Sequence, residues 1–347
     1  MKSYSIALIP GDGIGKEVIE SARRVLETAE KCFGSFNIEF KEYAAGQEVY
    51  EKIGESLPAE TLDGIKKADA ALIGALSASP SPAPSPVGQL RKELGLYADI
   101  RPVKAWAGVW AIKPNIDLIC IRENTEGFLA DRNLFMGNGE FMPTEDVVMS
   151  VRVLTKKASE RIAKYAFEFA RKQGRKKITV LHKANVLRKS CGFFLQIVRE
   201  IAKEYPDIEL DDEYVDNAAN NLILCPEKYD VILTTNLFGD IISDEAAALV
   251  SNLVPSANIG DGCAVFSPIN HDGKASEAGE NTVNPLIHII CAGMMLEYLG
   301  ERQAGQAIYE AVETVLREGL VKPLDLGGNS STSKVTSEIC SKIVCNY

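Results

Sequence analysis

Short apolar runs alternate with stretches of helical spacing along the first part of the chain. Residues 4 to 10 form an apolar run that ends at a glycine-rich turn, and residues 14 to 31 repeat apolar positions at helical spacing. A strand over residues 38 to 44, a helix over 58 to 67 and a strand over 70 to 73 continue the alternation. Such alternation predicts an α/β fold with a largely parallel sheet.

The pattern resumes after an irregular stretch. Residues 129 to 150 are rich in Gly and Met and have no regular period, which favours an arm or a hairpin. A helix is predicted over residues 156 to 172, a strand over 178 to 182, and a further helix that runs to residue 204.

The stretch NLFGDIISD, residues 236 to 244, is the first candidate for chemistry. It follows an apolar run, turns at Gly239 and carries Asp240 and Asp244 four residues apart, which places both carboxylates on one helix face. Ligands of α/β proteins bind at the carboxyl ends of strands, and Mg²⁺ takes carboxylate oxygens. The pair fits a divalent cation or, alternatively, two solvated acids stabilised by the helix dipole.

Further charged residues lie at the ends of predicted elements. Three arginines suit bidentate recognition of carboxylates, although each alone also fits a surface ion pair. They are Arg91, Arg101 and Arg122. Lys183 directly follows a buried strand, where desolvation or a neighbouring acid would change its pKa. Asp216 ends a short strand predicted over residues 213 to 215.

Composition limits the partners of the chain. Its 347 residues carry a formal net charge of −10, which argues against a nucleic-acid surface or an anionic membrane as the main partner. No apolar run approaches the roughly 18 to 20 residues that span a bilayer. Because the first apolar run breaks at Pro10 and Gly11, we expect a first strand rather than a signal peptide. The length predicts two domains or one large one.

The eight cysteines include no C-x-x-C pair and mostly lie within apolar runs. This pattern favours buried free thiols over disulfides or zinc ligands. We therefore expect a protein of the reducing cytoplasm.

Two further stretches are open to more than one interpretation. The turn GDGIG, residues 11 to 15, lacks the third glycine and the later acid of a dinucleotide fingerprint, so it is a weak Rossmann signal. Residues 77 to 86, SASPSPAPSP, are typical of a flexible linker, but they run into a predicted helix and fit a mobile loop beside a site equally well.

Nine motifs, in order along the chain, resemble those of the isocitrate, homoisocitrate and isopropylmalate dehydrogenase family, the NAD(P)-dependent β-decarboxylating dehydrogenases. The motifs are IPGDGIGKEV (9 to 18), LRKELGLYADIRP (90 to 102), IRENTEG (121 to 127), HKANVL (182 to 187), VDN (215 to 217), NLFGDIISD (236 to 244), PSANIGD (255 to 261), NP (284 to 285) and DLGG (325 to 328). The resemblance implies an α/β fold of two domains like that of isopropylmalate dehydrogenase, with a large twisted mixed sheet and not a true Rossmann fold. Residues 1 to 100 with 253 to 347 would form a large cofactor-side domain. Residues 101 to 252 would form a small domain with a dimerisation arm and the metal and catalytic residues.

The resemblance also implies a homodimer with active sites shared between its subunits, or a tetramer. The three arginines would bind the carboxylates of a (2R)-hydroxy di- or tricarboxylate. Mg²⁺ or Mn²⁺ would be held by Asp240 and Asp244 together with Asp216 of the partner subunit. Lys183 of the partner subunit would take the 2-hydroxyl proton. The cation polarises the developing ketone and stabilises the enolate left by CO₂, hydride goes to the nicotinamide, and a second acid protonates C3.

The chain departs from the family where that second acid is expected. The family places a tyrosine seven residues after the arginine of IRENTEG, and Leu129 stands there, after Phe128. Residues 270 to 275 read NHDGKA in place of the family's cofactor loop, so that His271 alone is retained. Such losses are also typical of the regulatory subunits of some NAD-dependent isocitrate dehydrogenases, which is the alternative interpretation. The intact lysine, arginines and aspartates favour an enzyme.

Further positions that match or differ from the family bear on the choice of substrate and cofactor. Ser85 matches the serine of isocitrate enzymes, whereas Val87 replaces their asparagine. We expect homoisocitrate or isocitrate as substrate, with isopropylmalate or tartrate as alternatives. Cofactor contacts are expected at His271, Glu277 and Asn284. An acid near the ribose would repel the 2′-phosphate of NADP, so Glu277 favours NAD.

Overall fold

The computed structural model describes residues 1–77, 83–129, 139–269 and 277–346. The chain forms two compact units. Unit 1 comprises Met1–Leu94, Trp106–Ala111 and Leu253–Tyr347, and unit 2 comprises Gly95–Ala105 and Ile112–Asn252. Each unit has its own strands, helices and buried apolar side chains.

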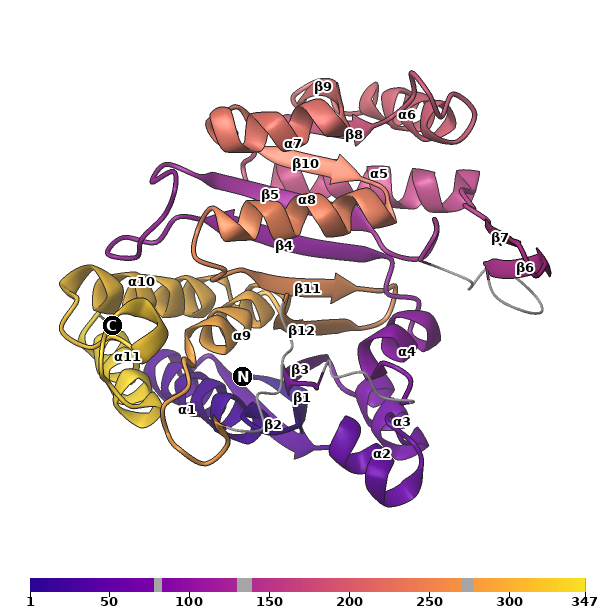
Figure 1. Ribbon diagram of the computed structural model, residues 1–347. Helices are drawn as coiled ribbons and strands as arrows, with labels where there is room; N and C mark the ends of the chain where they lie inside the picture. The colour runs from indigo at the N-terminus through magenta and orange to yellow at the C-terminus, as the bar shows by residue number, and fades with distance from the viewer. Residues whose placement is uncertain (78–82, 130–138, 270–276, 347) are drawn as a thin grey trace. The chain divides into compact units, whose positions relative to one another are not determined.

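The described residues of unit 1 form strands in the order β2-β1-β3-β12-β11 (Figure 1). Neighbours are parallel except for β11 and β12, which pair antiparallel. The strands are β1 (Lys2–Gly11), β2 (Phe36–Glu42), β3 (Ala70–Ala75), β11 (Pro255–Ile259) and β12 (Ala264–Pro268). The helices are α1 (Gly15–Phe33), α2 (Gln47–Ile53), α3 (Ala59–Lys67), α4 (Pro86–Glu93), α9 (Leu286–Tyr298), α10 (Arg302–Glu318) and α11 (Thr332–Asn346), with a 3₁₀ turn at Leu324–Leu326.

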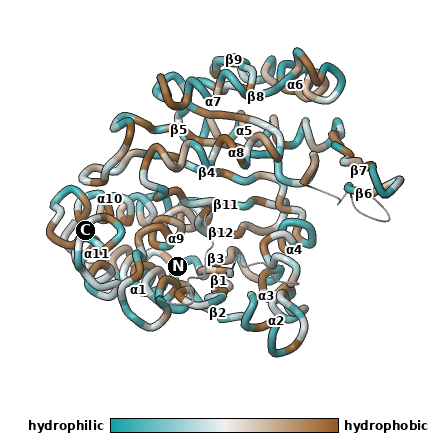
Figure 2. Tube along the Cα trace, in the orientation of Figure 1, coloured by the Kyte–Doolittle hydropathy of each residue, from teal (hydrophilic) through white to brown (hydrophobic). Residues whose placement is uncertain are grey.

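The core of unit 1 forms where the helices meet the sheet. Strand β3 is buried along its whole length, and α9 is apolar on most of its circumference, as Figure 2 shows by its hydrophobic colouring. A helix that is apolar nearly all round is one that other elements enclose. Helices α1 and α10 pack against α9, and α11 packs against α1.

In the described part of unit 2, the main sheet has the strand order β4-β5-β10-β8-β9. Strands β4 and β5 are antiparallel, and the others pair parallel. The strands are β4 (Ala98–Lys104), β5 (Asp117–Glu123), β8 (Lys177–His182), β9 (Glu209–Tyr214) and β10 (Val231–Thr234), and a separate hairpin joins β6 (Glu140–Thr144) to β7 (Val147–Ser150). The helices are α5 (Lys156–Lys172), α6 (Ser190–Ala202), α7 (Val215–Leu224) and α8 (Asn236–Ala248), with a 3₁₀ turn at Pro226–Lys228.

The glycine-rich turn after β1 is explained by close packing of the backbone. Gly11 has φ 78°, and a Cβ atom there would lie 2.0 Å from the Ala75 carbonyl oxygen. A Cβ atom on Gly15 would lie 1.9 Å from the Pro10 carbonyl oxygen. The glycines therefore let the turn and the start of α1 pass close to β1 and β3.

Most of the predicted elements form, and the mixed α/β class is confirmed. The expectation of a largely parallel sheet was only partly right, because β4 pairs antiparallel with β5 and β11 pairs antiparallel with β12. Two local predictions were wrong. Gly239 lies within α8 and makes no turn, and Asp216 lies in the first turn of α7 and not at the end of a strand.

The cysteines with described side chains are free thiols, and four are buried. Within the described parts of the chain, no helix combines the length and the apolar character needed to cross a membrane.

Candidate functional site

Two neighbouring strands and one helix of unit 2 bring buried arginines and aspartates together. Asp99 on β4 pairs in register with Arg122 on β5, and Arg101 follows Asp99 by two residues. Side chains two residues apart on a strand point to the same face. Helix α8 packs on β4 and β5, so its acids face these arginines.

Asp99 is the buried carboxylate that contacts both guanidinium groups. Its carboxylate lies 2.9 Å from Arg101 Nη2 and 3.7 Å from Arg122 Nη1. The side chain of Asp99 is fully buried, and those of Arg101 and Arg122 are 5% and 3% exposed. Charges this deep need partners, because each would otherwise lose its hydration without compensation.

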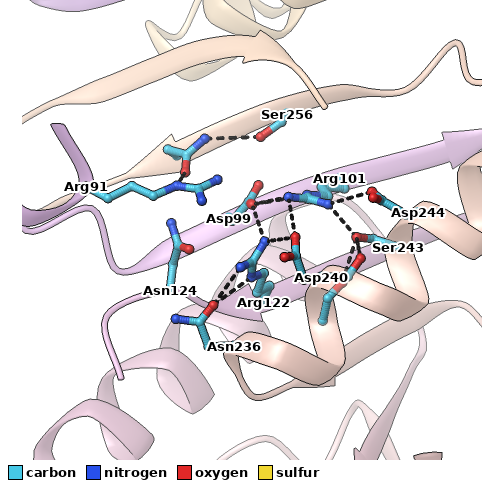
Figure 3. Close-up of polar contacts among 12 residues, drawn as sticks. Arg91, Asp99, Arg101, Arg122, Asn124, Asn236, Asp240, Ser243, Asp244 and Ser256 are labelled. Carbon is cyan, nitrogen blue, oxygen red and sulfur yellow. Dashed lines mark hydrogen bonds and ion pairs between the residues drawn. The ribbon is translucent and has the colours of Figure 1, made fainter. Parts of the chain in front are cut away.

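Helix α8 adds the outer carboxylates, as Figure 3 shows. Asp240 accepts a short hydrogen bond from Arg122 and lies 3.4 Å from Arg101 Nη2. Asp244 lies 3.2 Å from Arg101 Nη1. The side chains of Asp240 and Asp244 are 41% and 58% exposed, so both acids reach solvent while their inner oxygens are held by arginine.

Polar and small residues of α8 fix the arginine side chains. Asn236 Oδ1 accepts from Arg122 Nε at 3.0 Å and from Arg122 Nη2 at 2.6 Å, and Ser243 Oγ accepts from Arg101 Nη1 at 2.6 Å. A Cβ atom on Gly239 would lie 2.7 Å from Arg122 Cβ. The Arg122 side chain passes so close to the helix that only glycine fits at residue 239. This close approach explains why a glycine lies within α8.

The pKa shifts in the cluster follow from burial opposed by charge. Burial would lower the pKa of Arg101, but Asp99 and Asp240 raise it above its ordinary value. Burial lowers the pKa of Arg122 despite the same acids. Burial raises the pKa of Asp244, and Arg101 opposes that rise. Three carboxylates thus surround two guanidinium groups, and two of the three belong to the exposed acids of α8.

This donor set fits a hard divalent cation. Asp240 and Asp244 present carboxylate oxygens toward solvent from a rigid helix, and Mg²⁺ typically takes one or two protein carboxylates with the substrate and water completing its shell. Among the residues that the structure describes, no three His, Cys, Asp or Glu side chains of this chain gather closely enough to hold a metal ion. The chain thus offers two ligands at this position.

A second, separate pair in unit 2 joins Lys183 and Asp216. Lys183 Nζ lies 2.6 Å from Asp216 Oδ1 and 5.7 Å from the centre of the Tyr214 ring. The hydrogen bond from Lys183 lowers the pKa of Asp216. Lys183 is 27% exposed and directly follows β8, so strand and helix α7 together orient its amine.

Unit 1 holds the remaining two residues predicted to bind substrate. Ser85 caps α4, because its Oγ accepts from Gly88 N. Arg91, in the last turn of α4, donates from Nε to Asn258 Oδ1 on β11 at 2.9 Å (Figure 3). Asn258 is 2% exposed and in turn donates to Ser256 Oγ at 3.1 Å.

Two of the three predicted cofactor residues lie within the described segments. His271 lies outside the described residues. Glu277 is half-buried at the start of the next described segment. Asn284 donates to Asp325 Oδ2 at 3.0 Å and accepts from Leu286 N at 2.9 Å, so it ties the DLGG motif to the start of α9.

Leu129 occupies an exposed position after β5, with 47% of its surface accessible. The ring centre of its neighbour Phe128 lies 5.8 Å from the guanidinium carbon of Arg152. Arg152 also donates from Nη2 to Thr235 Oγ1 at 3.0 Å. A hydroxyl group at residue 129 would therefore be open to solvent or ligand rather than packed in the core.

Sequence reasoning missed three residues of the cluster. Asp99, Asn236 and Ser243 all lie inside motifs that the sequence singled out. The alternation of the ADIRP strand was the available signal for Asp99, since an acid two residues before a buried arginine shares its face. The other two are recognisable only once Arg101 and Arg122 are known to cross α8.

Comparisons with known proteins agree on one family. The family described as Isocitrate/isopropylmalate dehydrogenase matches residues 5–343. The chain is 46% identical to a 3-isopropylmalate dehydrogenase of Archaeoglobus fulgidus, over 97% of this chain and 98% of that protein. It is 43% identical to an isocitrate/homoisocitrate dehydrogenase of Thermus thermophilus, over 97% of this chain and 98% of that protein. Among solved structures, an isocitrate dehydrogenase of Methylococcus capsulatus superposes with a TM-score of 0.88 at 37% identity, covering 98% of this chain and 99% of that one.

Proposed function

Because this chain belongs to the isocitrate/isopropylmalate dehydrogenase family, we propose that it is an NAD- and divalent-metal-dependent enzyme that oxidatively decarboxylates a 3-substituted (2R)-malate. The observation that carries the proposal is the network of unit 2, in which two buried guanidinium groups and two exposed carboxylates are held together. Guanidinium groups bind carboxylates of a substrate, and exposed acids bind a cation.

Within this function, the arginines and the aspartates have different tasks. The three arginines, Arg91, Arg101 and Arg122, are the proposed ligands of the malate carboxylates. Asp240 and Asp244 hold Mg²⁺ or Mn²⁺ with Asp216 of the partner subunit. When bound, the cation supplies a Lewis acid for the 2-oxygen and the adjacent carboxylate.

Lys183 is the proposed base for the 2-hydroxyl proton. Its hydrogen bond to Asp216 orients the amine. NAD, when bound, accepts the hydride. His271, Glu277 and Asn284 are its proposed contacts, and the carboxylate of Glu277 disfavours the 2′-phosphate of NADP.

A homodimer with shared sites is supported by exposed apolar side chains of unit 2. The hairpin of β6 and β7 exposes large apolar residues, visible as its brown segments in Figure 2. They include Phe141, Met142, Val147, Val148 and Met149. Helices α7 and α8 expose Ile223, Leu224 and Ile241. Apolar patches of this kind mark protein interfaces, and Asp216 lies on one of these helices.

Homoisocitrate or isocitrate is the proposed substrate, because Ser85 offers a hydroxyl at the start of α4 to a third carboxylate. The 46% identity to a protein named 3-isopropylmalate dehydrogenase favours isopropylmalate as the second candidate.

A panel of substrates tests the proposal. The purified chain with Mn²⁺ and either NAD or NADP is offered isocitrate, homoisocitrate, isopropylmalate, malate and tartrate, and absorbance of the reduced nicotinamide is followed. We expect reduction of NAD that requires Mn²⁺ and is fastest with a tricarboxylate. Silence on every substrate would favour a regulatory subunit instead.

A further inference from the structure

A buried serine of unit 1 holds the first turn of α4. Ser56 lies between α2 and α3 and is 3% exposed. Its Oγ donates to the Pro84 carbonyl oxygen at 2.6 Å and accepts from Gln89 Nε2 at 2.9 Å. One hydroxyl group thus contacts the residue before Ser85 and a side chain one turn after it.

These contacts enclose the start of the helix. Gln89 Nε2 also lies 3.4 Å from the Pro84 carbonyl oxygen, and Gln89 N donates to the Ser85 carbonyl oxygen at 3.1 Å. Helix α4 has only eight residues, of which Pro86 and Leu90 are buried. A helix so short gains little stability of its own, so side-chain hydrogen bonds at its start contribute a large share of its order.

The loop that carries Ser56 is itself rigidly supported. The Ser56 carbonyl oxygen accepts from Gly46 N at 2.9 Å. The carboxylate of Asp12 accepts from Gln47 N at 3.0 Å and from Glu48 N at 2.9 Å, so it caps α2 next to Gly46. Ser56 therefore connects α4 to the turn after β1 through fixed backbone.

The other end of α4 has a separate anchor. Arg91 is held by Asn258, which is buried on β11. Loss of the Ser56 hydroxyl would release the first turn, with Ser85, and leave the Arg91 anchor intact. The two ends can therefore be perturbed independently.

We propose that Ser56 is a positioning residue that sets the place of Ser85 and so the preference of the enzyme for the third carboxylate of its substrate. This inference rests on the proposed function. Ser56 acts through Ser85 and Gln89 and does not touch substrate. A misplacement of about 1 Å in a positioned group can cost on the order of a hundredfold, so a shift of Ser85 would impair use of the carboxylate that it contacts.

The test compares Ser56→Ala with Thr61→Ala. Thr61 is 2% exposed and donates to the Ala44 carbonyl oxygen at 2.6 Å, so its loss removes an equally buried hydroxyl of unit 1 away from α4. We expect Ser56→Ala to raise KM for isocitrate and homoisocitrate about five- to tenfold. KM for NAD and for isopropylmalate should stay within about twofold, as should all constants of Thr61→Ala. Hydrogen exchange of the backbone amides of residues 87 to 90 should become faster in Ser56→Ala and stay unchanged in Thr61→Ala.

If Ser56→Ala does not fold, Gln89→Leu removes the partner donor from a half-buried position and should give the same selective rise in KM. Equal effects of Ser56→Ala and Thr61→Ala on tricarboxylate KM would overturn the positioning role while the proposed function stands. No turnover by the unaltered protein on any substrate would remove the proposed function, and the role of Ser56 in selection with it.

Discussion

Two buried aspartates, one in each unit, are matched by different partners. In unit 2 the fully buried Asp99 is matched by the guanidinium groups of Arg101 and Arg122. In unit 1 Asp12, 4% exposed, is matched by backbone amides, those of Gln47, Glu48 and Ser77. The charge of Asp99 is thus opposed by charge, whereas that of Asp12 is opposed by peptide dipoles.

The difference indicates what each arrangement is for. Peptide donors fix loops, because every donor belongs to the backbone that must be held. Side-chain cations also fix a site, but they carry a charge that remains available to a ligand. The cluster of unit 2 therefore presents the outer oxygens of two carboxylates to solvent, whereas the network around Asp12 sets the shape of a helix end.

Removal of one charge should affect the two networks unequally. Asp99→Asn leaves two buried guanidinium groups without their inner acid, so we expect a loss of about 3–5 kcal/mol in the free energy of unfolding. Asp12→Asn removes hydrogen bonds to a charged acceptor and should cost about 1–3 kcal/mol. Denaturant unfolding of both variants at pH 7 measures the difference. Equal losses would break the distinction between the two aspartates.

Acid should destabilise unit 1 through a buried histidine. His288 on α9 is 4% exposed, and burial lowers its pKa from 6.5 to about 4. Between these two pKa values the unfolded chain binds a proton at this residue and the folded chain does not. The contribution of His288 to the free energy of unfolding is therefore fully present above about pH 6.5 and decreases as the pH drops toward 4. We expect a loss of about 2 kcal/mol from this residue between pH 7 and pH 5. His288→Leu should flatten the dependence by that amount, and an unchanged slope would contradict the assignment.

The absence of a hydroxyl group at Leu129 should limit turnover. Leu129→Tyr places a phenol where the family has its tyrosine, and a positioned general acid accelerates proton transfer. We expect about a tenfold gain in kcat with the preferred substrate, a modest share of what general acids supply. Phe128→Tyr is the matched control, because it adds the same hydroxyl group at the adjacent exposed residue. A gain in both variants, or in neither, would count against a specific role for residue 129.

Much of the fold was accessible from local patterns. The helix predicted over residues 156 to 172 forms with those bounds, and Asp240 and Asp244 share a helix face as their spacing required. Helix α2 was missed, because none of its seven residues is buried and it leaves no apolar period.

What the sequence could not supply was contact between distant elements. Asp99 is explained only by the register of β4 with β5, and Gly239 only by Arg122 crossing α8. Likewise, the pairing of Asp216 with Lys183 joins β8 to α7 across 33 positions of sequence. Each residue type was ordinary in its local setting and became informative through its neighbour in space.

Metal binding by the acids of α8 is the most direct test of the central claim. Mn²⁺ is titrated by calorimetry into the unaltered chain, Asp240→Asn and Glu245→Gln, the last a matched control because Glu245 lies on the same helix beside Asp244. We predict that the unaltered chain and Glu245→Gln bind Mn²⁺ alike and that Asp240→Asn weakens binding at least about tenfold. Unchanged affinity in Asp240→Asn would contradict the assignment of the site.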